Sequence, residues 1–139
     1  AKHAGQSIVK RMLKLGIDIH NANVGILGIT FKENCPDVRN TKILDLYREL
    51  QEWSVEPLVY DPWADPEELR AELNIDMVEF EQMVDLDALI VTVGHNEFRA
   101  LRPKELKEMC RNGDALLADL KSIYDRDALE LQGLTVFRL

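Results

Sequence analysis

The stretch VGILGIT, residues 24–30, decides the fold class of this 139-residue chain. Apolar residues and glycine fill all of it except the last position. An unbroken apolar run of this length is typical of a strand that is covered on both faces of a sheet. Four further runs predict strands at VEPLVY (55–60), DALIVTV (87–93), ALLADL (115–120) and LTVFRL (134–139). IDMVEF (75–80) is ambiguous between a short strand and a turn.

Amphipathic helical patterns separate these strands. The first covers residues 1–15 and is closed by Gly16, and the second covers residues 41–53. Asp65 caps a third helix, which begins at Pro66, and two more cover residues 102–110 and 124–132. Because strands and helices alternate without hairpin signals, the connections are right-handed crossovers between parallel strands. We therefore predict an α/β, Rossmann-like three-layer domain with a mainly parallel sheet.

Composition narrows the class of protein. The chain is 46% hydrophobic and 30% charged, as expected for one soluble globular domain. Its formal net charge of −8 argues against nucleic-acid binding. It has no apolar run near the length of about 18 residues that a membrane span needs, and no visible signal peptide. Two cysteines without a CxxC pattern favour a reducing cytoplasm, and three histidines without metal-ligand spacing predict no metal site.

A ligand site is expected beyond the carboxyl ends of the strands, where parallel α/β sheets bind their ligands. Four polar segments follow predicted strands there, at residues 30–40, 61–66, 94–98 and 119–124. The first segment follows Gly25 and Gly28 but lacks the third glycine of a dinucleotide fingerprint, and it is not a P-loop either.

Lys32 and Arg39 flank this first polar segment, and their spacing leaves two interpretations open. They belong either to a solvated loop with local ion pairs, or to a clamp that holds an anion beside the start of the next helix. In the clamp, Lys32 lies at the strand end and Arg39 at the helix entrance.

Three longer motifs carry a resemblance: GILGITFKENCPDVRNTKILDLYREL (25–50), VYDPWADPEE (59–68) and ADLKSIYD (118–125). Together they resemble the C-terminal domain of the UDP-glucose/GDP-mannose dehydrogenase family, and most of all its bacterial members that oxidise UDP-N-acetylhexosamines. That family's pattern places Gly-x-x-Phe-Lys and Asp-x-Arg between a strand and a helix. The resemblance spans nearly the whole chain and favours the anion clamp.

The resemblance implies a three-part enzyme with an NAD-binding domain, a central dimerising segment and a UDP-binding domain. Residues 1–20 are then the end of the central helical segment with its connector, and residues 21–139 the UDP-sugar-binding domain. Such enzymes oxidise the C6 alcohol of a UDP-sugar to a carboxylate by two hydride transfers to NAD, and serve capsular or surface polysaccharide synthesis. The implied partners are a UDP-sugar, the NAD-binding domain of the same full-length chain and a second copy in a homodimer.

The resemblance also implies site residues. Phe31 and Lys32 contact the UDP-sugar, and Arg39 reaches toward NAD on the other domain. Lys121 stands where many members have an arginine that reaches a UDP-sugar, and lysine lacks the bidentate fork of that arginine. The family's nucleophilic cysteine lies in an upstream motif that nothing here matches, so we expect this chain, as a fragment, to be inactive alone. Cys35 is interpreted as a loop cysteine.

Other polar residues have mainly structural interpretations. Asp61 is expected to cap the turn DPWADP, Trp63 to pack, and His95 to be an exposed loop histidine. A receiver-like signalling module is the alternative function, with Asp61 or Asp119 as phosphoacceptor. It is disfavoured because the first strand is not followed by the acidic pair that holds magnesium. A true NAD-binding domain is disfavoured by the missing glycine.

Overall fold

The structure is a computed structural model that describes residues 3–139, so the first two residues of the helix predicted at 1–15 lie outside it. The helices are α1 (Ala4–Lys14), α2 (Ile43–Glu52), α3 (Pro66–Leu73), α4 (Asn96–Arg99), α5 (Pro103–Met109) and α6 (Arg126–Leu131), with 3-10 turns η1 (Ile19–Asn21) and η2 (Phe80–Gln82). The strands are β1 (Val24–Leu27), β2 (Leu58–Tyr60), β3 (Ala88–Val91), β4 (Ala115–Asp119) and β5 (Leu134–Phe137).

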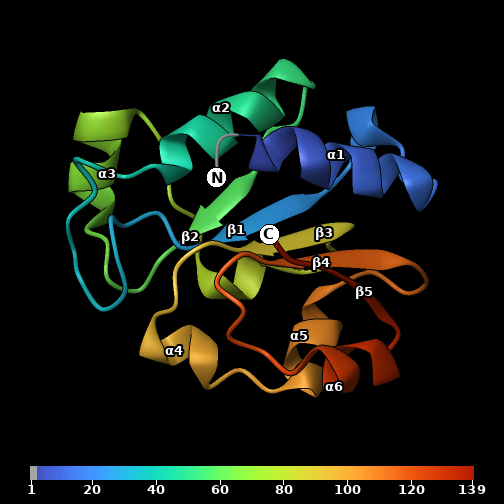
Figure 1. Cartoon of the computed structure of the whole chain (residues 1–139). Helices are drawn as coiled ribbons and strands as arrows, with labels where there is room; N and C mark the ends of the chain where they lie inside the picture. Colours follow the sequence, from blue (N-terminus) through green and yellow to red (C-terminus); the bar gives the residue numbers. More distant parts are fainter. Residues whose placement is uncertain (1–2) are drawn as a thin grey trace.

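All five strands are parallel, in the order β2-β1-β3-β4-β5. Helices α1 and α2 lie on one side of the sheet, with α5 and α6 on the other (Figure 1). The predicted three-layer α/β fold is therefore confirmed. The strand order reverses between β1 and β3, and the carboxyl ends of two strands at such a reversal border a crevice in open α/β sheets.

Strand geometry sorts the core into two apolar clusters, one on each face of the sheet. Adjacent residues of β1 point to opposite faces, so Ile26 joins the cluster under α1 and α2 while Leu27 joins the cluster over α5 and α6. Burial of every residue in β1, β3 and β4 explains their unbroken apolar sequences.

The helix α1 belongs to the first of these clusters. Its residues Ile8, Val9 and Met12 are fully buried there, and α1 packs against α2. The division of the chain at residue 20 remains a prediction. Within residues 3–139, no helix is long and apolar enough to cross a membrane.

Two local features refine the sequence expectations. Residues 75–80, which the sequence left open between a short strand and a turn, form no strand and lead into the 3-10 turn η2, which begins at Phe80. The short helix α4 follows β3 where only a polar rim segment was expected. The start of α3 is as predicted, since Pro66 is its first residue and the Asp65 carboxylate accepts a hydrogen bond from the Glu67 backbone N–H at 3.0 Å.

Candidate functional site

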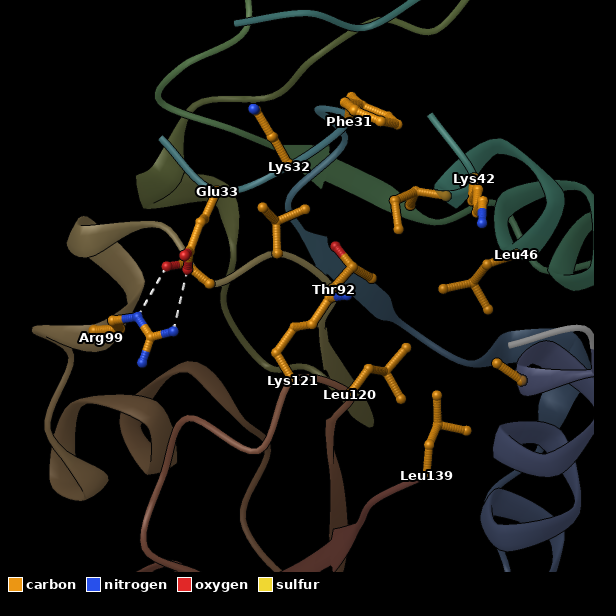
Figure 2. Close-up of a pocket in the computed structure, with 14 residues that line it drawn as sticks. Phe31, Lys32, Glu33, Lys42, Leu46, Thr92, Arg99, Leu120, Lys121 and Leu139 are labelled. Atoms are coloured by element: carbon orange, nitrogen blue, oxygen red, sulfur yellow. Dashed lines mark hydrogen bonds and ion pairs between the residues drawn. The ribbon is translucent and has the colours of Figure 1, made fainter. Parts of the chain in front are cut away.

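A pocket of about 500 Å³ opens at the carboxyl edge of the sheet. Its walls come from the β1–α2 loop, the starts of α1 and α2, and residues that follow β3, β4 and β5 (Figure 2). The residues that give it charge and an aromatic face are Phe31, Lys32, Glu33, Lys42, Arg99 and Lys121. Four cations against one carboxylate make this pocket suited to an anion, although the whole chain is acidic.

The fold brings together three of the four predicted site residues. Phe31 and Lys32 follow β1 and are exposed, and Lys121 follows β4 on the opposite wall (Figure 2). Lys42 and Arg99 also line this pocket, and neither was predicted from the sequence as a site residue. Lys42 directly precedes α2, and Arg99 is the last residue of α4, directly after the polar segment 94–98.

Arg39 is the predicted residue that does not line the pocket. Its side chain is mostly exposed and its Nε lies 3.4 Å from Oδ1 of Asp37. The backbone N–H of Arg39, followed by its side chain, lowers the pKa of the Asp37 carboxyl. A contact between Arg39 and a cofactor on another domain stays a prediction.

The β1–α2 loop leaves the sheet at Gly28 and closes on itself. The Phe31 backbone N–H donates to the Asp37 carbonyl at 2.7 Å, so residues 31–37 form a closed excursion at the pocket edge. At Gly28, φ is +112° and a Cβ atom would lie 2.7 Å from Oγ1 of Thr92. This glycine is thus required by the close approach of β1 and β3.

Asp61 is fully buried at the end of β2, beneath this loop. Its Oδ2 accepts hydrogen bonds from the backbone N–H groups of Ile29 at 2.8 Å and Thr30 at 3.1 Å, and its Oδ1 accepts one from Trp63 at 2.8 Å. The predicted turn cap is confirmed. Burial by itself would raise the pKa of Asp61, but hydrogen bonds from His95, Ile29 and Trp63 outweigh it, and the pKa is lowered.

The expectation that His95 is an exposed loop histidine is wrong. His95 is fully buried, and its Nε2 lies 3.0 Å from the Asp61 carboxylate. The backbone N–H of Asn34 donates to its Nδ1 at 2.8 Å, so Nδ1 carries no proton and Nε2 is the ring's donor. The burial of His95 could not be predicted from the sequence around it, because its partners, Asp61 and Asn34, are distant along the chain.

The lowered pKa of Asp61 predicts acid sensitivity. Above its ordinary pKa of 3.8, the ionised carboxylate contributes stability, which is lost as the pH falls through the lower folded value. We expect Asp61→Asn to be less stable than wild type at about pH 7 and to lose less of its free energy of unfolding between about pH 5 and pH 3. Urea unfolding across that range measures both. Equal acid losses in the two proteins would contradict the assignment.

A surface ion pair joins the β1–α2 loop to α4. Arg99 Nη2 lies 3.2 Å from Glu33 Oε2, and Arg99 Nε donates to the Gly94 carbonyl at 3.0 Å (Figure 2). The pair packs directly on Gly94, where a Cβ atom would lie 2.9 Å from Arg99 Nη2. Glu33 thereby neutralises one of the pocket's cations.

The remaining candidates have structural roles. Cys110 is buried, and burial raises the pKa of its thiol to about 11, while Cys35 is a half-buried loop residue. Trp63 stacks on His95 with ring centroids 6.0 Å apart. Within residues 3–139, no group of three or more His, Cys, Asp or Glu side chains is arranged to hold a metal ion.

The geometry does not fit the receiver-like alternative. A phosphoacceptor must be reachable, yet Asp61 and Asp119 are both fully buried. Asp119 accepts hydrogen bonds from the backbone N–H groups of Ile123 and Tyr124, at 3.1 and 3.0 Å. Both carboxylates shape turns at the rim of the sheet.

The sheet order and the cationic pocket at its carboxyl edge define a Rossmann-like α/β domain suited to a phosphorylated ligand. Residues 25–126 match the UDP-binding domain of the UDP-glucose/GDP-mannose dehydrogenase family, and the chain belongs to that family.

Relatives of known name support this membership. The chain is 39% identical over 130 residues to the UDP-N-acetyl-D-glucosamine 6-dehydrogenase of Salmonella typhi, covering 94% of this chain and 30% of that protein. The enzyme of the same name from Pseudomonas aeruginosa is 38% identical over 125 residues, covering 90% of this chain and 29% of that protein. The chain thus spans about 30% of the length of these relatives.

Solved structures show the same fold. The NDP-N-acetyl-D-galactosaminuronic acid dehydrogenase of Methanosarcina mazei superposes with a TM-score of 0.84 at 18% identity, covering 96% of this chain and 28% of that one. The UDP-glucose dehydrogenase of Pyrobaculum islandicum gives 0.69 at 23% identity, covering 99% and 28%.

Proposed function

We propose that this chain is the UDP-sugar-binding domain of an NAD-dependent nucleotide-sugar 6-dehydrogenase that oxidises a C6 alcohol to a carboxylate. The observation that carries the proposal is the convergence of Phe31, Lys32 and Lys121 on one pocket of about 500 Å³. Membership of the family and the names of the relatives support the class of reaction.

The proposed roles follow from position and charge. Lys32 and Lys121 approach the pocket from two walls and donate to the diphosphate, while the exposed Phe31 ring offers an apolar face to the nucleotide (Figure 2). Lys42, at the entrance to α2, adds a third cation beside the helix N-terminus, whose partial positive charge also favours phosphate.

The residues of this domain do not fit NAD in the manner of a dinucleotide-binding strand. The turn after β1 lacks the third glycine, and Phe31 and Lys32 stand in its place. The Asp61 carboxylate, which would hold a ribose, is buried and already accepts hydrogen bonds from backbone N–H groups and His95. We therefore assign NAD to a separate domain of the full-length chain, toward which Arg39 reaches.

The rest of the proposal concerns the whole enzyme. It works in the cytoplasm as a homodimer and supplies precursors of capsular or surface polysaccharide. This chain by itself is inactive, because it contains neither the nucleophilic cysteine motif nor the NAD domain.

Calorimetric titration of the 139-residue chain tests the proposed ligand. UDP is expected to bind, and uridine to bind at least about tenfold more weakly, because each lost charge-assisted hydrogen bond is worth about 1.5–3 kcal/mol. Mixing the chain with NAD and UDP-N-acetylglucosamine should give no NADH absorbance. Equal affinity for uridine and UDP would contradict the diphosphate site, and turnover would contradict the assignment of the chemistry to other domains.

A further inference from the structure

We propose that the buried Asp61–His95 pair, together with Thr30, is a positioning device that fixes the β1–α2 loop so that Phe31 and Lys32 face the pocket. This inference rests on the proposed function, since it concerns how the UDP-sugar site is held in shape. The three residues do not line the pocket themselves, and all three are fully buried.

The pair holds the loop at three backbone positions. Asp61 accepts the N–H groups of Ile29 and Thr30, and His95 Nδ1 accepts the N–H of Asn34. These contacts join β2 and the end of β3 to the loop, across 31 to 61 positions of sequence. The loop is therefore anchored on both sides of Phe31 and Lys32.

A hydroxyl extends this network to Lys32. His95 Nε2 lies 3.0 Å from Asp61 and 3.1 Å from Thr30 Oγ1, and Thr30 Oγ1 donates in turn to the Lys32 carbonyl at 3.2 Å. Because Asn34 occupies Nδ1, the Nε2 proton is shared between Asp61 and the hydroxyl, and the hydroxyl proton is free for Lys32. The backbone of Lys32, which is proposed to bind the diphosphate, is thus hydrogen-bonded directly to the buried network.

The same geometry excludes a catalytic relay. In a relay, the carboxylate and the hydroxyl contact opposite nitrogens of the imidazole. Here both contact Nε2, and the ring has no exposed surface.

Side chains fasten the outer end of the loop as well. Asn34 Nδ2 donates to Asn96 Oδ1 at 3.2 Å, and the Asn96 backbone N–H donates to Asn34 Oδ1 at 3.0 Å. Asn34 adopts a left-handed conformation with φ of 53°, which asparagine tolerates better than most residues. The loop conformation is thus set by Asp61, His95 and Asn96, which lie outside the loop itself.

Fold stability alone does not account for such a pair. Replacing a buried ion pair or network by apolar groups of similar volume is often neutral or stabilising. A polar network that ties this loop to the turn after β2 and to His95 is well suited to giving the loop one conformation.

Thr30→Val tests the link with an isosteric change, and Thr30→Ser is the matched variant that keeps the hydroxyl. We expect Thr30→Val to weaken UDP binding by about threefold to tenfold, the effect of one neutral hydrogen bond, and Thr30→Ser to bind within about twofold of wild type. Amide hydrogen exchange of Phe31 and Lys32 should accelerate in the valine variant alone. Unchanged UDP affinity and unchanged exchange in Thr30→Val would overturn the inference.

Asp61→Asn tests the buried carboxylate, with Asp87→Asn as the control. Asp87 also accepts a distant backbone N–H, from Asn23 at 2.7 Å, and pairs with Arg111 at 3.0 Å, but at the amino edge of the sheet. We expect Asp61→Asn to weaken UDP binding about tenfold or more and Asp87→Asn to leave it within about twofold, even where both lower the thermal midpoint.

Equal losses of affinity in the two aspartate variants would reduce the effect to general destabilisation and overturn the inference. If Asp61→Asn does not fold, the comparison of Thr30→Val with Thr30→Ser tests the inference by itself. Wild-type protein that does not bind UDP would refute the proposed function itself, whereas wild-type binding with an unaffected Thr30→Val refutes only the positioning device.

Discussion

Replacing Lys32 with alanine is expected to weaken binding of the UDP-sugar by about tenfold or more in the full-length dehydrogenase that we propose. Lys32 lies on the pocket wall just past β1, and its side chain is exposed. A charge-assisted hydrogen bond to a phosphate is worth about 1.5–3 kcal/mol, which corresponds to a change of roughly tenfold to a hundredfold.

The Michaelis constant for the UDP-sugar measures this loss, and Lys104→Ala provides the control. Lys104 is also an exposed lysine, but it lies on α5 and does not line the pocket. Its removal lowers the net charge equally, so it accounts for any long-range electrostatic effect. An unchanged Michaelis constant in Lys32→Ala would remove Lys32 from the site.

Replacing Gly28 with alanine is expected to destabilise the fold by about 2–6 kcal/mol. At φ of +112° an alanine is strained, at about 1–3 kcal/mol. Its Cβ would also lie 2.7 Å from Thr92 Oγ1, which is held by hydrogen bonds to the Leu27 and Gly28 carbonyls at 2.9 and 2.6 Å. Since Thr92 is held in place by these hydrogen bonds and cannot move aside easily, overpacking adds about 1–3 kcal/mol.

Gly113→Ala separates strain from contact. Gly113 also has a positive φ, of +89°, but no atom lies within 4 Å of where its Cβ would stand. We expect it to cost about 1 kcal/mol, from strain alone. Urea unfolding of the two variants gives both free energies. Similar values for Gly28→Ala and Gly113→Ala would contradict the close packing of β1 against β3.

The sheet was predictable because its strands are covered on both faces. Buried parallel strands carry unbroken apolar sequences, and residues 24–30, 87–93 and 115–120 meet that condition. Residues 75–80 mix apolar and acidic side chains, and the structure forms only a connection there. Local pattern does not separate an edge strand from a packed connection of that kind.

The pocket was partly predictable, because loops that follow parallel strands meet at one edge whatever their sequence separation. That rule predicted the edge of the sheet where the pocket lies, and the family resemblance singled out Phe31, Lys32 and Lys121, which line it. It did not distinguish a buried histidine from an exposed one. Burial of His95 depends on Asp61, 34 positions away, and on a backbone N–H, neither of which leaves a local trace.

A crystal structure of the chain with UDP-N-acetylglucosamine tests the central claim most directly. We predict the diphosphate in the pocket at the carboxyl edge of the sheet, with its oxygens about 2.7–3.2 Å from the Lys32 ammonium and the Phe31 ring against the nucleotide. A nucleotide sugar bound away from the loop between Phe31 and Asp37 would contradict the account.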